Sequence, residues 1–226
     1  MIQGLGARHA SWPYVAPFVV FLVLLAWGPY SGLGPAAHYP IRVVVVTGVL
    51  LLWSRRLVRL KPSRPLGSVA IGLFVFLVWV APDLLWPGYR AHWLFQNAVT
   101  GEAASSVAEH HRTAGGYLVW RMAGLVLLVP VIEELFWRAW LMRYLVSRDF
   151  ERIPLGTYSA ASFWICAVLF ATEHGPYWDV GLAAGIVFNW WMIRTRNLGD
   201  CILAHAVTNA CLGAYVLVFS KWQYLL

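Results

Sequence analysis

Seven apolar runs dominate this chain, and most of them are long enough to cross a lipid bilayer as a helix. A spanning helix needs about 20 mainly apolar residues, because a rise of about 1.5 Å per residue must cover a hydrocarbon core of about 30 Å. None of the runs alternates apolar and polar residues as the strands of a membrane β-barrel do. The runs lie at about residues 12–30, 38–54, 66–86, 116–147, 159–174, 177–194 and 199–219.

The amino-acid composition agrees with a protein that is embedded in a membrane. Hydrophobic residues make up 60% of the chain and charged residues 12%, whereas soluble domains carry roughly 25% charged residues. The 14 Trp and 10 Tyr residues suit the aromatic belts at the two membrane interfaces. We therefore predict an all-α, polytopic transmembrane helical bundle of about seven helices, or eight if residues 87–115 contain another. Residues 1–226 are predicted to form a single integral membrane domain.

The distribution of basic residues predicts an orientation in the membrane and not nucleic-acid binding. The formal net charge is +7, and Lys and Arg concentrate in the loops at 55–64, 143–152 and 194–196. These loops lie on the same side of the membrane if the seven runs alternate in direction. Basic loops face the cytoplasm and attract anionic lipids. We therefore predict a multi-pass cell-membrane protein with a cytoplasmic N-terminus, with the lipid bilayer as a partner and no nucleic acid.

The fourth apolar run contains charged residues that are costly to bury. Residues 131–138 read Val-Ile-Glu-Glu-Leu-Phe-Trp-Arg. A charge inside the bilayer costs at least ~2.5 kcal/mol on insertion scales, so such groups mark functional sites by default. Glu134 and Arg138 are four residues apart and share a helix face, which predicts a buried, supporting ion pair. Glu133 points about 100° away on the same helix, and we predict that it is the carboxylate that performs the chemistry.

Two later polar patches supply the other groups of a hydrolytic site. His174 closes the fifth run, in the segment 170–174 that reads Phe-Ala-Thr-Glu-His, while the adjacent Glu173 is expected to point elsewhere as a helix-end charge. His205 and Asn209 lie four residues apart in the seventh run, so their side chains can aim at one point. Carboxylate, imidazole and amide groups from three helices would then meet inside the bundle.

These groups predict an intramembrane endopeptidase that attacks a peptide bond with an activated water. Glu133 would be the general base, and His174 would orient the water. His205 and Asn209 would stabilise the oxyanion, a contribution whose loss typically costs ~3–4 kcal/mol. A covalent acyl-enzyme is a poorer fit, because the chain has no Gly-x-Ser-x-Gly motif and no membrane-embedded Ser or Cys with an obvious adjacent base.

The same polar residues also allow other interpretations of the function. They could form a charge network that only holds the bundle together, or they could line the proton or solute path of a transporter. The chain has no internal repeat of the kind that transporters often show. A non-catalytic scaffold that binds hydrophobic peptides is a third alternative. The three cysteines lack metal-ligand spacing and are predicted to pack in the core.

A zinc site is the main mechanistic alternative. Glu133, His174 and His205 could form a His₂Glu zinc site with an open position for water. No His-Glu-x-x-His motif is present to build such a site on one helix. We therefore favour a metal-independent glutamate mechanism and predict no cofactor.

Three ordered motifs, Glu-Glu-x-x-x-Arg at 133–138, Phe-x-x-x-His at 170–174 and His-x-x-x-Asn at 205–209, resemble those of the CPBP intramembrane proteases. This is the family of the type II CAAX prenyl endopeptidases, and the resemblance covers about residues 117–215. It implies a cavity inside the helical bundle, with catalytic-motif helices over residues 117–219. It also implies the same roles for the four predicted catalytic residues, and a peptide or protein substrate that enters from the membrane or its cytoplasmic face.

A narrower resemblance is to the bacterial CAAX-protease-related proteins that accompany exosortase sorting systems, and it would place the protein in a bacterial inner membrane. It rests on Glu-Glu-Leu-Phe-Trp-Arg at 133–138 followed by Leu-Met-Arg-Tyr-Leu at 141–145, and on Cys-Ile-Leu-Ala-His-Ala-Val-Thr-Asn at 201–209. The family name does not fix the substrate, because a CAAX substrate needs a prenylated Cys and many bacteria lack such proteins.

Overall fold

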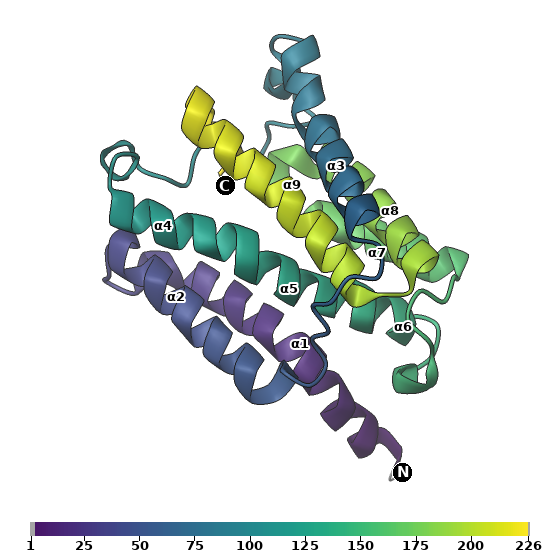
Figure 1. Cartoon of the computed structure of the whole chain (residues 1–226). Helices are drawn as coiled ribbons and strands as arrows, with labels where there is room; N and C mark the ends of the chain where they lie inside the picture. The colour runs from purple at the N-terminus through teal and green to yellow at the C-terminus, as the bar shows by residue number, and fades with distance from the viewer. Residues whose placement is uncertain (1–2, 226) are drawn as a thin grey trace.

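The computed structural model describes residues 3–225, with side chains from residue 10 onward. This part of the chain is helical, and its one β-bridge, between Asn97 and Gly101, is isolated. The predicted all-α bundle is therefore confirmed (Figure 1). The α-helices are α1 (Gln3–Trp27), α2 (Pro35–Val49), α3 (Pro65–Leu85), α4 (Gly115–Ala123), α5 (Val129–Glu134), α6 (Met142–Tyr144), α7 (Ala160–Thr172), α8 (Trp178–Thr195) and α9 (Leu198–Phe219).

Three of these helices, α4, α5 and α6, form one continuous rod, Gly115–Tyr144, with π-helical stretches at 124–128 and 135–141. With the rod taken as one helix, the described helices follow the seven predicted runs. Of these, α1, α2, α3, the rod and α9 are long and apolar enough to cross a membrane, and α7 is a shorter apolar helix. Residues 87–114 form turns and short 3₁₀ helices, so the eighth long helix considered from the sequence is not formed there.

The helices pack in two groups that meet along α9. In the first group α1 and α2 lie against each other and against the rod. In the second group α3 packs on α8 and α9, and α7 packs on α8. α9 also contacts the rod along 124–128 and α5, as Figure 1 shows for the yellow helix beside the teal one. The three segments that carry the sequence motifs therefore converge where the two groups join.

The close approach of α3 and α9 depends on Gly72. A Cβ at this position would lie 2.5 Å from the carbonyl oxygen of Ala204 and 2.7 Å from the side chain of Val207. Small residues at helix contacts let the backbones of membrane helices come close. Thr208 donates a hydrogen bond to the carbonyl oxygen of Gly72 at 3.0 Å. These contacts hold α9, and with it His205, in a fixed position against α3.

A buried arginine ties the connection after α3 to the start of α8. Arg90 pairs with Asp83 at 3.1 Å and with Asp179, and it donates to the carbonyl oxygen of Pro176 at 2.8 Å. Tyr89 donates a hydrogen bond to Asp179 at 3.1 Å. Partial burial and the neighbouring Asp179 carboxylate raise the pKa of the Tyr89 hydroxyl, so it remains a donor at neutral pH.

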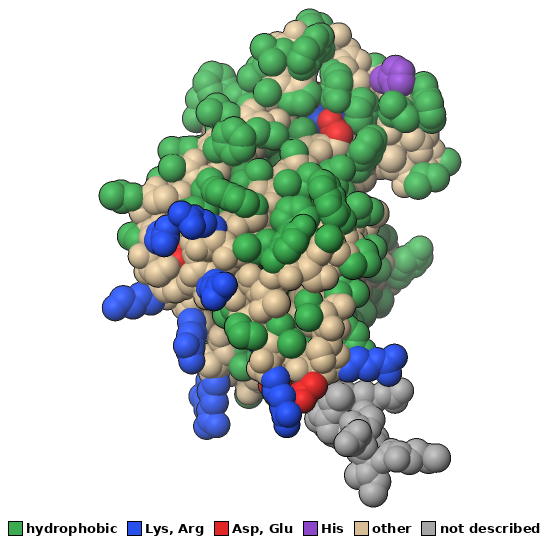
Figure 2. Space-filling view, turned by 90° about the vertical axis from the view of Figure 1, so that its right-hand side faces the viewer, with side chains coloured by type: hydrophobic (Ala, Val, Ile, Leu, Met, Phe, Trp, Pro, Cys, Tyr) green, Lys and Arg blue, Asp and Glu red, His purple; other side chains and the backbone are tan. Residues whose placement is uncertain are grey.

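Many of the basic residues gather at one end of the surface, although Lys221 is exposed after the opposite end of α9. Figure 2 shows Lys and Arg side chains gathered at one end of the visible face, with apolar side chains over the rest. Many large apolar residues are exposed, among them Leu52, Val119 and Val218 at 76%, 69% and 72%. An exposed apolar surface of this kind suits a protein whose solvent is lipid. The side of the membrane that the basic end faces stays a prediction.

Candidate active site

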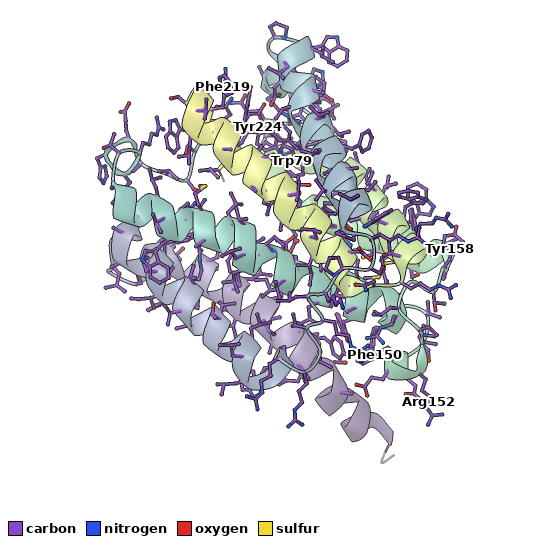
Figure 3. The ribbon with its side chains drawn as sticks, in the orientation of Figure 1. Trp79, Phe150, Arg152, Tyr158, Phe219 and Tyr224 are labelled. Carbon is purple, nitrogen blue, oxygen red and sulfur yellow. The ribbon has the colours of Figure 1, made fainter. Side chains whose placement is uncertain are left out.

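A partly open cavity of about 220 Å³ lies between the two helix groups. Glu133 of α5, His174 after α7, and His205 and Asn209 of α9 all line this cavity. The structure therefore brings the four predicted catalytic residues to one space, although they come from three distant parts of the chain. Apolar residues of α1 and α3 complete the wall. Trp79 and Tyr224, which are also in the wall, lie near α9 in Figure 3.

Glu134 and Arg138 form the ion pair that their spacing predicted. Nη1 of Arg138 lies 3.0 Å from Oε1 of Glu134, and both side chains are fully buried. Nε of Arg138 donates to Oδ1 of Asn189 on α8 at 3.1 Å. The guanidinium also lies over the ring of Phe170, 4.4 Å from its centre. The pair thus connects the rod to α7 and α8.

His205 makes a second contact with Glu134. Its Nδ1 lies 2.9 Å from Oε1 of that carboxylate. A carboxylate only accepts, so His205 donates from Nδ1 and leaves Nε2 for the cavity. In a neutral ring Nε2 is an acceptor, and it becomes a donor only when the ring is doubly protonated. The predicted oxyanion role of His205 therefore requires the imidazolium form, a condition that the sequence did not reveal.

His174 is oriented by its own backbone. Its Nδ1 lies 2.8 Å from the carbonyl oxygen of Phe170. Since a carbonyl only accepts, Nδ1 carries the proton, and Nε2 of the neutral ring can accept a hydrogen bond or a proton. The last carbonyls of a helix lack partners within the helix, so a His that follows the helix end can supply a donor. Gly181 makes room for the ring, because a Cβ there would lie 3.0 Å from Nδ1.

Glu133 differs from its neighbour Glu134 because its carboxylate is open. Among the described residues, no hydrogen bond or ion pair joins the Glu133 side chain to another group. The side chain lines the cavity, where water can reach it. The Glu134 carboxylate is thus held by two hydrogen-bond partners, whereas the Glu133 carboxylate is free to form contacts in the cavity.

Glu173 corrects one expectation from the sequence. It lines the same cavity, and its Oε2 accepts a hydrogen bond from Nε1 of Trp137 at 3.1 Å. The expectation that it points elsewhere is therefore wrong, although Glu173 is, as expected, an exposed charge at the end of α7. The physical reason is that α7 ends at Thr172, so helical spacing no longer sets the directions of Glu173 and His174. The cavity holds two carboxylates, Glu133 and Glu173.

Asn209 is held by the rod. Its Nδ2 donates to the carbonyl oxygen of Leu125 at 2.9 Å, and Leu125 also lines the cavity. The amide group has a second N–H hydrogen that this bond does not use. Thr208, by contrast, donates to backbone oxygens of α3 and α9 and acts as an interhelical clamp.

The described residues do not bring together the side chains that a metal ion would need as ligands. Among the described residues, no group of three or more His, Cys, Asp or Glu side chains could hold a metal ion. The zinc set considered from the sequence, Glu133, His174 and His205, is not such a group. Metal independence of the activity stays a prediction.

Taken together, the fold and the cavity define a membrane-embedded helical protein whose polar groups face an internal space. Residues 115–211 match the model of the family described as type II CAAX prenyl endopeptidase Rce1-like. The family resemblance predicted from the three motifs is confirmed. Comparison with curated proteins and with solved structures gave no match. This match supports a membrane peptidase that acts on a protein or peptide substrate.

Proposed function

We propose that this protein is an intramembrane endopeptidase in which Glu133 and His174 activate a water molecule. The observation that carries the proposal is the open carboxylate of Glu133 in a cavity that it shares with His174, His205 and Asn209. Glu134 fits this role less well, because Arg138 and His205 both bind its Oε1 and its side chain is not in the cavity wall.

The proposed reaction moves one proton twice. Glu133 accepts a proton from water while Nε2 of His174 accepts a hydrogen bond from the same water. The water oxygen bonds to the carbonyl carbon of the substrate, and negative charge develops on the carbonyl oxygen. The proton then passes from Glu133 to the amide nitrogen as the C–N bond breaks, which releases an amine and a carboxylic acid.

His205 and Asn209 would stabilise the developing oxyanion. Asn209 has its second N–H available, and His205, whose Nδ1 is held by Glu134, would donate from Nε2 in its imidazolium form. Donors that are already held in place stabilise such charge without reorganisation, and losing one typically costs ~3–4 kcal/mol.

The wall formed by α1 supports a substrate with an apolar tail that arrives through the membrane. Leu22 and Leu25 line the cavity and are 39% and 48% exposed. Phe18 and Phe21 extend this apolar wall inward. An apolar chain in the bilayer could therefore reach the cavity without crossing a polar surface. We infer that the basic end of the bundle faces the cytoplasm of a bacterial cell.

The test uses the purified full chain in proteoliposomes with quenched fluorescent peptides that end in Cys-aliphatic-aliphatic-X, each with and without a farnesyl group. We expect cleavage of at least one peptide, and its loss in Glu133→Gln. Glu102→Gln, which changes an exposed acid outside the cavity, should retain wild-type turnover. Chelation with 1,10-phenanthroline should leave the rate unchanged.

Two results would overturn the proposal. Wild-type turnover in Glu133→Gln would reject the assigned base, and stoichiometric zinc whose removal ends cleavage would reject metal independence. A solute flux that depends on Glu133, with no peptide cleaved, would favour the transporter alternative.

A further inference from the structure

The hydrogen bond between Asn209 and Leu125 has its origin in the backbone of the rod. Residues 124–128 are π-helical, and the N–H of Val129 bonds to the carbonyl oxygen of Gly124, five residues earlier. π-Helical stretches of this kind are rare and often lie at functional sites. The next carbonyl, that of Leu125, therefore needs a donor from residue 129 or residue 130.

Neither of these two backbone donors serves Leu125. The N–H of Val129 is directed to Gly124. Residue 130 is proline, which has no N–H. Pro130 is buried, as is most of its surroundings in α5. A carbonyl that lacks a donor in a membrane interior is costly, because no solvent can replace the missing bond.

The side chain of Asn209 supplies the missing donor. Its Nδ2 lies 2.9 Å from the Leu125 oxygen, and Asn209 is 8% exposed. Since a carbonyl only accepts, the nitrogen of the amide, and not its oxygen, must face Leu125. This contact fixes the orientation of the amide group about its terminal bond. The second N–H of the same nitrogen then lies at the wall of the cavity that both residues line.

We propose that Pro130 is a positioning residue for Asn209. Because proline has no backbone N–H, the Leu125 carbonyl oxygen stays free to accept a hydrogen bond from Asn209. This hydrogen bond anchors the Asn209 amide and orients it toward the oxyanion of the substrate. The inference deepens the proposed function and rests on it for the role of Asn209. It assigns to Pro130 a part in the reaction although this residue does not touch the substrate.

The first experiment is Pro130→Ala, which supplies an N–H that can bond to Leu125 and release Asn209. Alanine is also the better helix former, so the variant is expected to fold. We expect kcat to fall about tenfold or more with KM little changed, because an interaction of the transition state is weakened.

The double variant Pro130→Ala/Asn209→Ala should be no slower than Asn209→Ala alone. Pro40→Ala, which replaces a helix-interior proline of α2 outside the cavity wall, is the matched control and should retain wild-type kcat.

A second measurement does not depend on any substrate. In protein labelled with ¹⁵N-asparagine, the side-chain resonance that disappears in Asn209→Ala identifies Asn209. This resonance should shift in Pro130→Ala and stay unchanged in Pro40→Ala. If Pro130→Ala does not fold, Pro130→Leu supplies the same N–H and is measured in the same way.

The outcomes separate this inference from the proposed function. An unshifted resonance, or an unchanged kcat in Pro130→Ala while Asn209→Ala is impaired, overturns the positioning role alone. A shifted resonance together with full activity of Asn209→Ala shows that the anchor exists but that Asn209 has no part in catalysis, which overturns both the role of Asn209 and the reason for positioning it.

Discussion

Two adjacent carboxylates of α5 have different surroundings. Oε1 of Glu134 accepts from both Arg138 and His205, whereas Glu133 faces the cavity without a partner among the described residues. The other oxygen of Glu134 and Nη2 of Arg138 have no hydrogen-bond partner in the described part of the chain. When a buried hydrogen-bond network already contains unpaired polar atoms, removing one more of its groups is expected to destabilise the fold strongly. Replacing Glu134 should therefore lower mainly the stability of the protein, whereas replacing Glu133 should lower mainly its activity.

Glu134→Gln should destabilise the protein by about 3–5 kcal/mol, because it leaves the buried guanidinium of Arg138 without a carboxylate. Thermal unfolding in detergent measures the change. Glu133→Gln is the matched control, since it replaces a carboxylate that forms no hydrogen bond, and its unfolding should resemble that of the wild type. Equal losses in the two variants would contradict the division between a structural and an open carboxylate.

His174→Gln should retain more activity than His174→Ala. A glutamine amide can place an acceptor near the position of Nε2, although it cannot take up a proton, whereas alanine removes the acceptor altogether. Losing a general acid–base group typically costs about 10²–10⁴-fold, so His174→Ala is expected in this range and His174→Gln at or below its lower end. The measurement is kcat on the peptide that the wild type cleaves. A rate for His174→Gln no higher than that for His174→Ala would contradict the role of Nε2 as a hydrogen-bond acceptor for the water.

At the scale of the elements, the sequence predicted contacts within a helix and missed contacts that depend on helix ends and on other helices. Glu134 and Arg138 were found because four residues make one turn. The bond from His205 to Glu134 joins residues 71 positions apart, and no local pattern encodes it. Glu173 was misplaced because the end of α7 could not be fixed to the residue. The extents of the helices were predictable since apolar length alone defines a spanning segment.

Gly72→Ala tests the contact between α3 and α9. The added Cβ would lie 2.5 Å from a backbone oxygen of α9, which cannot move without shifting the helix. Overpacking of this kind typically costs about 1–3 kcal/mol, and unfolding in detergent should report it. Gly116→Ala, where a Cβ meets nothing within 4 Å, should be neutral or stabilising. A wild-type melting temperature for Gly72→Ala would mean that the two helices are less tightly packed than described.

At the scale of the whole molecule, the family region and the membrane-spanning helices do not coincide. The family match covers 115–211, whereas α1, α2 and α3 precede it. α1 and α3 nevertheless supply part of the cavity wall through Phe18, Leu22 and Trp79. The choice of substrate is therefore expected to depend on residues outside the family region. Their identity gave no signal in the sequence, because apolar residues of a cavity wall and of a lipid-facing surface look alike.

The orientation in the membrane is tested by labelling introduced cysteines in intact cells and in inverted vesicles. Arg152→Cys, in the basic loop before α7, should react with a membrane-impermeant maleimide only from the cytoplasmic side. Val99→Cys, which is 94% exposed in the connection before the rod, should react only from the opposite side. The native Cys166 and Cys201 are buried and Cys211 is half-buried, so labelling of the wild type gives the background to subtract. Labelling of both positions from one side would refute the alternating arrangement.

The position of the cavity between two helix groups couples the entry of a peptide to the distance between the proposed catalytic residues. Glu133 belongs to the group of α1, α2 and the rod, whereas His174 belongs to the group of α3, α7, α8 and α9. In the proposed mechanism, a motion that parts the two groups to admit a peptide would also move Glu133 away from His174. Cleavage and peptide exchange would then be separate phases of one cycle, and lateral pressure of the bilayer on the bundle would favour the phase in which bonds are cut.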